Sequence, residues 1–193
     1  MKTLLILGAG KEQVNAIDRA LEKGIRTVVL DMNPNAAGAS HADEFYPVST
    51  RDTPAILEFL KGYAKKIDGV MTIASDIPHC VSAAAEFLRV RHIPRVVADT
   101  CINKLKMKEA LKAKGITIPA FRTVESLEDL KSFIDEAGYP VVIKPVDNSG
   151  ARGVLHLTRD VDTSWAFDYA KKISFSGGLI AEKFIEGLQI STE

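Results

Sequence analysis

The hydrophobic pattern of the first hundred residues alternates between short apolar runs and segments of helical spacing. Residues 3–7 and 27–30 are compact apolar runs, which are typical of buried strands. Between them, Val14, Ile17 and Leu21 recur at helical spacing, which predicts a helix over residues 12–23. A strand, a helix and a second strand in this order predict a parallel sheet with a right-handed crossover.

The same alternation continues to about residue 100. We expect strands at 44–48, 70–74 and 95–98, and helices at 54–65 and 78–88. This order predicts a small doubly wound α/β domain with a parallel sheet. Asp76 follows the strand at 70–74, where ligands of open α/β sheets bind, so it is a candidate substrate-facing residue. The alternative is that Asp76 only caps the next helix.

A glycine-containing turn after the first strand has some features of a dinucleotide site. Gly8 and Gly10 follow the strand, and Asp31 comes roughly 20 positions later, as in the dinucleotide-binding fingerprint. Gln13 stands where the third glycine of that pattern belongs. Gly8 and Gly10 are therefore candidate substrate-facing residues, and the alternative is a turn that many doubly wound folds share.

The pattern changes after residue 100. Residues 101–118 predict a connecting helix that is rich in lysine and ends at Gly115. Lys104 and Lys108 are four residues apart on one helix face, where two like charges are unfavourable unless an anion lies between them. The alternative is a solvated lysine face.

Residues 119–185 predict an α+β unit, because helices here accompany strands that can pair in antiparallel fashion. Strands are expected at 121–124, 141–144, 154–157 and 179–185, and helices at 126–137 and 162–173. Ser126 and Asp129 have the spacing of a capping box at the start of a helix.

The predicted hairpin at 141–157 suggests a ligand. Alternate side chains of a strand face opposite sides, so Lys144 points away from Val141 and Ile143. The loop that follows carries Gly150 and Gly153, which allow backbone amides to approach an anion. A lysine beside such a loop suits a nucleotide polyphosphate. The alternative is an ordinary hairpin with a flexible loop and a solvated lysine.

Charge and cysteine content narrow the class of protein. The 193 residues include 25 Lys plus Arg and 25 Asp plus Glu, so the net charge gives no reason to expect nucleic acid or an anionic membrane as a partner. The first apolar run breaks at Gly8 and is too short for a signal peptide or a membrane span, so we expect a cytoplasmic protein. Cys80 and Cys101 are far apart in sequence, and we expect free buried thiols.

Four motifs in order resemble the amino-terminal part of ATP-grasp ligases, in the carbamoyl-phosphate synthetase-like and biotin-carboxylase-like branch. They are LGAG, then NKLKMK with GITIP, then YPVVIKPVDNSGARGV, and finally LIAEKFIEG. The resemblance covers the whole chain. It implies a pre-ATP-grasp domain at 1–100, a connecting helix at 101–118, an ATP-grasp lid subdomain at 119–185, and the start of a carboxyl subdomain at 186–193 whose remainder is missing.

The same resemblance implies an ATP site. Lys104 and Lys144 match the two phosphate-binding lysines, and the loop at 149–153 matches the flap over the phosphates. Glu182 matches the acid that meets the adenine amino group, and the backbone of Lys183 and Ile185 matches the adenine hinge. The implied ATP-binding residues are Lys104, Lys144, Ser149, Gly150, Ala151, Arg152, Gly153, Glu182, Lys183, Ile185 and Gln189.

Two residues depart from the family pattern. Asn103 stands where the family commonly has Asp, which affects the start of the helix more than the chemistry. Gln189 stands where such enzymes usually place a ribose-binding glutamate. Its amide can still bond ribose hydroxyls, although without the charge that strengthens such bonds.

For the parent protein, the resemblance implies an ATP-dependent ligase that converts a carboxylate to an acylphosphate, which an amine or similar nucleophile then captures. ATP and Mg²⁺ are the implied cofactors. The Mg²⁺ ligands are expected beyond Glu193, so we expect no catalysis from this chain alone. The surface that a carboxyl subdomain would cover is expected to be apolar and exposed, which favours self-association, for example as a homodimer.

Two other hypotheses stay open at this point. One is a nucleotide or dinucleotide sensor that binds its ligand at the GAG turn. The other is a degenerate scaffold that keeps the fold and binds no ligand.

Overall fold

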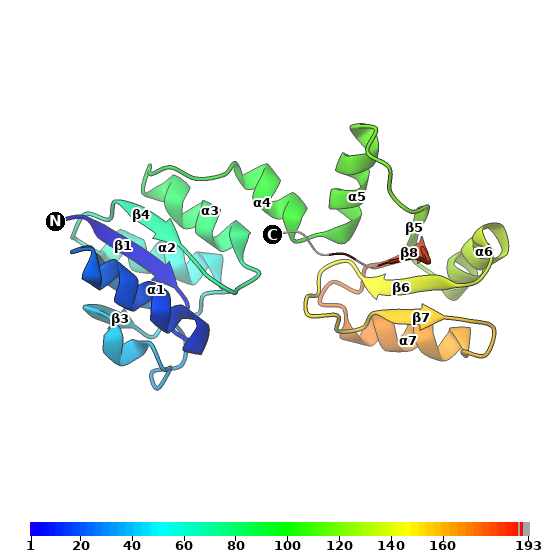
Figure 1. The fold of residues 1–193 in the computed structure, drawn as a ribbon, viewed down its shortest axis with the longest axis horizontal. Helices are drawn as coiled ribbons and strands as arrows, with labels where there is room; N and C mark the ends of the chain where they lie inside the picture. The colour runs from blue at the N-terminus through cyan, green and yellow to red at the C-terminus, as the bar shows by residue number, and fades with distance from the viewer. Residues whose placement is uncertain (189, 191–193) are drawn as a thin grey trace. The chain divides into compact units, whose positions relative to one another are not determined.

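The computed structural model describes residues 1–188 and 190, and its contacts divide into two compact units, Met1–Ile102 and Asn103–Glu193. The first unit contains β1 (Thr3–Leu7), α1 (Lys11–Glu22), β2 (Arg26–Leu30), η1 (Ala39–His41), β3 (Glu44–Tyr46), α2 (Thr53–Gly62), β4 (Gly69–Met71), α3 (Pro78–Phe87) and α4 (Arg95–Cys101). Its four strands form a parallel sheet in the order β3-β2-β1-β4 (Figure 1).

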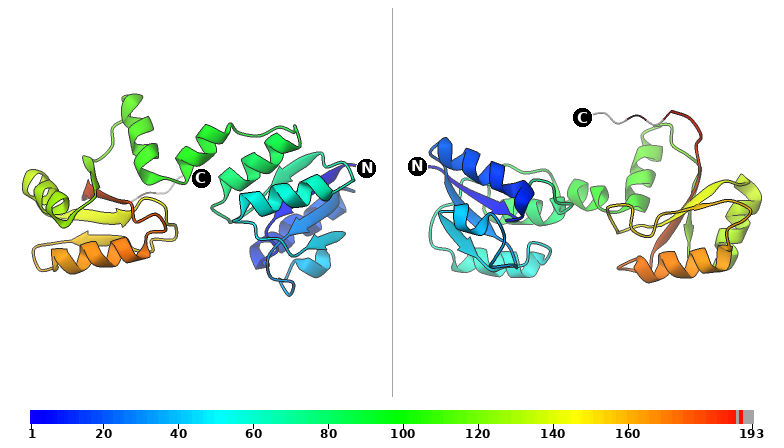
Figure 2. Two further views of the ribbon diagram at one scale, coloured as in Figure 1. Left: turned by 180° about the vertical axis from the view of Figure 1, so that it is seen from behind. Right: turned by 60° about the horizontal axis from the view of Figure 1, so that its bottom comes forward.

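The first sheet is apolar on both faces, because helices cover both. Leu5 and Leu7 of β1 belong to one buried cluster with Ile56 of α2 and residues of α3. Ile6 points the other way and packs with Ile17 of α1. Figure 2 gives two further views of this arrangement. The unit is therefore doubly wound, and the predicted fold class is confirmed.

The prediction of a strand at 95–98 is wrong, because these residues begin helix α4. Pro94 is the N-cap of that helix, and Val96 and Val97 are 70% and 45% exposed. A β-branched run favours a strand only when a sheet buries it, and no such burial occurs here. Strand β4 is also shorter than predicted, since Ala74 has a positive φ of 52° and the hydroxyl of Thr72 donates to the carbonyl of Leu7.

The second unit contains α5 (Lys104–Ala113), β5 (Phe121–Val124), α6 (Leu127–Ala137), β6 (Val141–Pro145), β7 (Leu155–Leu157), α7 (Thr163–Ile173) and β8 (Leu179–Lys183). Its sheet is antiparallel in the order β5-β8-β6-β7. The predicted hairpin is present as β6 and β7. Helix α5 is shorter than the segment predicted at 101–118.

One face of the second sheet forms the core of this unit. Val141, Ile143 and Ala181 are fully buried there and pack with Leu130 of α6 and Phe167 of α7. The capping box predicted at Ser126 and Asp129 is present and starts α6. Helices α6 and α7 pack on this face. Because successive residues of a strand face opposite sides, the alternate residues of β6 and β8 lie on the other face.

Candidate functional site

The opposite face of the second sheet carries a buried carboxylate. Glu182 of β8 alternates with the core residue Ala181, so its side chain points away from α6 and α7. It lies opposite Val142 of β6 and Phe121 of β5 in the strand register, and it is only 7% exposed. A buried charge of this kind requires partners.

Two lysines contact this carboxylate. Nζ of Lys108 lies 2.7 Å from Oε2 of Glu182, and Nζ of Lys144 lies 2.7 Å from Oε1. Oε1 is buried, and its contact with Lys144 lacks hydrogen-bond geometry, so this oxygen accepts no hydrogen bond from the described part of the chain. The Lys144 contact is an ion pair without a directed hydrogen bond. A buried acceptor in this state can take a donor from a ligand.

Helix α5 carries Lys104 and Lys108. Asn103 caps it, because its Oδ1 accepts from the backbone N–H of Lys106 at 3.0 Å. The Lys104 N–H donates to the carbonyl of Val146 at 2.8 Å, and its ammonium donates to the carbonyl of Asn148. The departure from the family pattern at Asn103 therefore leaves the helix start intact.

Lys108 is a site residue that the sequence prediction did not include. It is 7% exposed and is the one buried residue of α5, so the solvated-face alternative is wrong for this lysine. The signal in the sequence was its four-residue spacing from Lys104, which is unfavourable for two like charges unless an anion lies between them. The anion that Lys108 contacts is Glu182.

The loop after β6 is anchored at its base by Asp147. Its carboxylate accepts from the Ser174 hydroxyl at 2.9 Å and from the Ser176 N–H at 2.6 Å. Burial raises the pKa of Asp147, but hydrogen bonds from Ser176, Ser174 and Phe175 outweigh burial and hold the pKa below its usual value. Asp147 therefore ties the end of β6 to the turn before β8.

The rest of this loop has a fixed base and an exposed tip. Asn148 is 9% exposed, and its Nδ2 donates to the carbonyl of Ile173 at 3.0 Å. Arg152 donates through Nε to the carbonyl of Ser149 at 3.1 Å. Gly150, Ala151 and Arg152 are exposed, whereas Gly153 is buried. The loop thus carries exposed backbone beside the site, on an anchored base.

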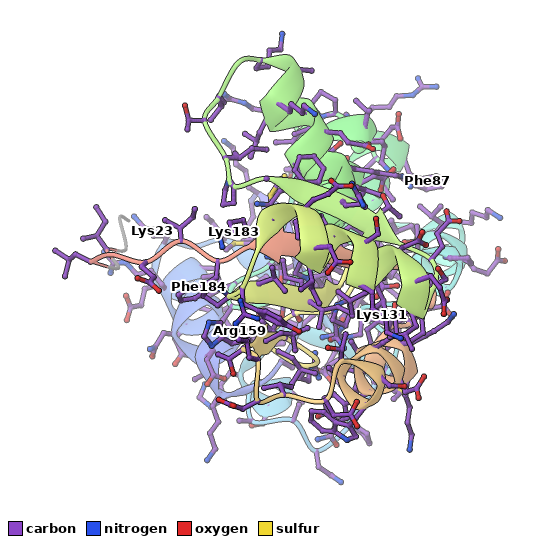
Figure 3. The ribbon with its side chains drawn as sticks, turned by 90° about the vertical axis from the view of Figure 1, so that its right-hand side faces the viewer. Lys23, Phe87, Lys131, Arg159, Lys183 and Phe184 are labelled. Atoms are coloured by element: carbon purple, nitrogen blue, oxygen red, sulfur yellow. The ribbon has the colours of Figure 1, made fainter. Side chains whose placement is uncertain are left out.

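The chain after β8 passes beside the same face. The Lys183 N–H donates to the Ala120 carbonyl at 2.8 Å, so it is not available to adenine, and the Lys183 ammonium donates to the carbonyl of Gly138. Figure 3 labels Lys183 and Phe184, where the chain leaves β8. The ring centroids of Phe184 and His156 are 4.3 Å apart. Ile185 is 63% exposed, and Gln189 lies outside the described residues.

The candidate residues of the first unit lie in a different environment. Oδ2 of Asp31 accepts from the Ala9 N–H at 2.9 Å, so this carboxylate holds the turn itself. Gln13 is buried, and a Cβ on Gly10 would lie 2.9 Å from its Oε1. The side chain of Gln13 therefore occupies the space that the fingerprint reserves for a close pyrophosphate, which argues against the dinucleotide hypothesis.

Asp76 is exposed and does not cap α3. The N-cap of that helix is Ile77, and no side chain caps it, so the capping alternative is wrong. Asp76 as a substrate-facing residue stays a prediction. Of the two cysteines, Cys80 is buried as expected, whereas Cys101 is exposed.

Comparison with protein families gives two matches that together span most of the chain. Residues 4–90 match the family described as "PylC-like, N-terminal domain", and residues 101–193 match the family described as "ATP-grasp domain". Residues 101–193 are an ATP-grasp domain. The buried carboxylate, its two lysines and the anchored loop all lie within the ATP-grasp domain.

Curated relatives match the chain over nearly all its length. The formate-dependent phosphoribosylglycinamide formyltransferase of Leptothrix cholodnii is 26% identical over 201 residues, which cover 95% of this chain and 47% of the relative. The enzyme of the same name from Wolinella succinogenes is 27% identical and is also covered to 47%. The chain thus spans about half the length of the curated relatives it matches.

Solved structures share the fold to a similar extent. Phosphoribosylglycinamide synthetase from Anaerococcus prevotii has a TM-score of 0.69 at 25% identity, with 96% of this chain and 46% of that chain covered. The biotin carboxylase domain of the Hydrogenobacter thermophilus 2-oxoglutarate carboxylase has a TM-score of 0.75 at 21% identity, covering 96% and 44%. That domain was solved with MgADP, ADP and bicarbonate.

Among residues 1–188 and 190, no group of three or more His, Cys, Asp or Glu side chains is arranged to hold a metal ion. No helix of the described residues has the length and apolar character needed to cross a membrane.

Proposed function

We propose that this chain binds ATP in its second unit and forms the ATP-binding part of an ATP-dependent ligase. The observation that carries this proposal is the buried Glu182 carboxylate, whose Oε1 accepts no hydrogen bond from the described residues, between two lysines and beside an anchored loop. The match of residues 101–193 to the ATP-grasp domain family supports the same assignment.

The proposed roles follow the chemistry of each group. Glu182 offers Oε1 to the adenine amino group, which is a hydrogen-bond donor. Lys144 and Lys104 bind the phosphates, because ammonium groups are strong donors to phosphate oxygens. The loop at residues 149–153, which is exposed at 150–152, closes over them. The carbonyl of Lys183 and the backbone of Ile185 border the adenine ring, and Gln189 meets the ribose.

We further propose the reaction of the parent protein. A carboxylate substrate attacks the terminal phosphorus of ATP and ADP leaves, which gives an acylphosphate; an amine or similar nucleophile then displaces phosphate. Mg²⁺ supplies charge neutralisation in phosphoryl transfer, and we assign it no ligand among the described residues. We propose that residues 1–193 alone bind ATP without turning it over.

Replacement of Lys144 by alanine tests the proposal. We expect Lys144→Ala to abolish ATP binding by this chain, measured by calorimetry, because the phosphates lose a cation. For the same reason we expect the substitution to abolish ATP turnover by the parent protein. Lys131→Ala is the matched control, since Lys131 is an exposed lysine of α6, which packs on the other face of the sheet (Figure 3). Unchanged ATP affinity in Lys144→Ala would overturn the proposal.

A further inference from the structure

The two lysines that contact Glu182 differ in their surroundings. The Lys108 side chain is 9% exposed and comes from α5. The Lys144 side chain is 20% exposed and comes from β6, just before the anchored loop. One carboxylate between two ammonium groups leaves an excess of one positive charge among these three side chains. Only one of the two lysines is needed to neutralise Glu182.

We propose that Lys108 is a positioning residue, which remains the counter-ion of Glu182 while Lys144 exchanges from Glu182 to the polyphosphate of the nucleotide. This inference rests on the proposed function. Lys108 itself touches no part of the nucleotide. It acts through Glu182 and Lys144.

The role of Lys108 follows from the cost of an isolated buried charge. A buried carboxylate that loses its counter-ion is strongly destabilised. With Lys108 in place, Lys144 can leave Glu182, and the carboxylate still has an ammonium 2.7 Å away. Without Lys108, Lys144 becomes the counter-ion of Glu182 and is held there. The affinity for phosphate would then fall, although the phosphate contacts themselves are unchanged.

The position of Lys108 fits a residue that stays in place. Its ammonium lies 5.9 Å from the centroid of the Phe121 ring, so the aromatic face of β5 supports it from a second side. Lys112, one turn further along α5, lies 5.8 Å from the same ring, but it is exposed and makes no ion pair within the described part of the chain. Lys112 therefore provides a matched control.

Calorimetric titration with ATP and with adenosine tests the exchange. We expect Lys108→Met to weaken ATP binding about tenfold or more while adenosine binding stays within about twofold, because adenosine has no phosphate. Lys108→Arg, which keeps the charge, and the double variant Lys108→Met with Glu182→Gln should both bind ATP more tightly than Lys108→Met alone. Lys112→Met should resemble the wild type.

A purely structural role predicts a different result, namely equal losses for ATP and adenosine, and that result would overturn the inference. Absence of ATP binding by the wild-type chain would instead overturn the proposed function. The two failures are therefore distinguishable.

A second measurement needs no nucleotide. Melting temperatures of Lys108→Met and Lys144→Met, each with and without Glu182→Gln, give two double-mutant cycles. We expect Glu182→Gln to reverse more of the loss in Lys108→Met than in Lys144→Met, since Lys108 is the permanent partner. Coupling of Lys144 to Glu182 that equals or exceeds that of Lys108 would contradict the inference.

Discussion

At the scale of single residues, Glu44 in the first unit concentrates several interactions on one carboxylate. It accepts from the hydroxyls of Tyr46 and Tyr63 at 2.9 Å each, and it pairs with Arg26 at 2.8 Å and with Lys65 at 3.1 Å. Burial raises the pKa of Glu44, but these hydrogen bonds outweigh burial and lower the pKa from 4.5 to about 2. The ionised form is therefore favoured by folding.

The lowered pKa of Glu44 predicts that the first unit loses stability in acid. Because the folded pKa lies below the unfolded one, the contribution of Glu44 is complete above pH 4.5 and is lost as the pH falls towards 2. We expect it to reach up to about 3 kcal/mol in the free energy of unfolding. Chemical denaturation at several pH values should show a weaker acid dependence in Glu44→Gln.

The control for this prediction is Glu58→Gln. Glu58 is a 75% exposed carboxylate on the neighbouring α2, and it pairs only with Lys61 among the described residues. Its removal should leave the acid dependence unchanged. An acid dependence in Glu44→Gln identical to that of the wild type would contradict the assignment.

The candidate site also shows what single residues reveal before a structure is known. Lys144 could be found because strand alternation separates it from Val141 and Ile143, and the structure places these two in the core. Lys108 could not be assigned, since its burial depends on Glu182, which is 74 positions away in sequence. Sequence spacing suggested an anion but could not supply its identity.

At the scale of elements, the loop between β6 and β7 depends on two glycines in different ways. Gly153 has φ +76°, and a Cβ there would lie 2.8 Å from Cγ of Pro145 and 3.0 Å from Cγ2 of Ile173. Gly150 has φ +63°, but a Cβ there would meet nothing within 4 Å. Only Gly153 is restricted by packing as well as by backbone conformation.

Substitution of each glycine by alanine separates the two effects. We expect Gly150→Ala to cost about 1 kcal/mol from the positive φ alone. Gly153→Ala should cost about 2–4 kcal/mol, because overpacking adds to the same backbone cost. Urea denaturation measures both, and equal costs would show that the loop base is not packed as described.

Some elements could be predicted from local sequence patterns, and others could not. The strands β1 and β2, the hairpin of β6 and β7, and the capping box of α6 follow from local periodicity and turn chemistry. The segment at 95–98 carries the same apolar signal as a strand but forms the start of α4 with Val96 exposed. Whether a sheet edge receives such a segment is a tertiary property, which a local pattern does not contain.

At the scale of the whole molecule, the two units carry different kinds of loop. The GAG turn of the first unit is filled by Gln13 and closed by Asp31, whereas the loop of the second unit presents exposed backbone at 150–152. This difference between the loops predicts which nucleotide the chain selects.

The division of the chain into four parts and its self-association remain predictions.

We expect the chain to bind ATP and not NAD in parallel calorimetric titrations. NAD requires close approach of its pyrophosphate to the glycine turn, and the Gln13 side chain lies in that space. The Lys144→Ala variant, which should lose the ATP signal, is the control for binding to the second unit. A saturable NAD signal that survives in this variant would favour the sensor hypothesis.

The position of β8 has a consequence for the synthesis of the protein. This strand is the last of its sheet in the sequence, yet it lies between β5 and β6. Until residues 179–183 leave the ribosome, the nascent hairpin and β5 have no strand to join them, and their unpaired edges are open to misassembly. Cotranslational folding of this unit therefore waits for β8, and this interval is when a chaperone would be of most use.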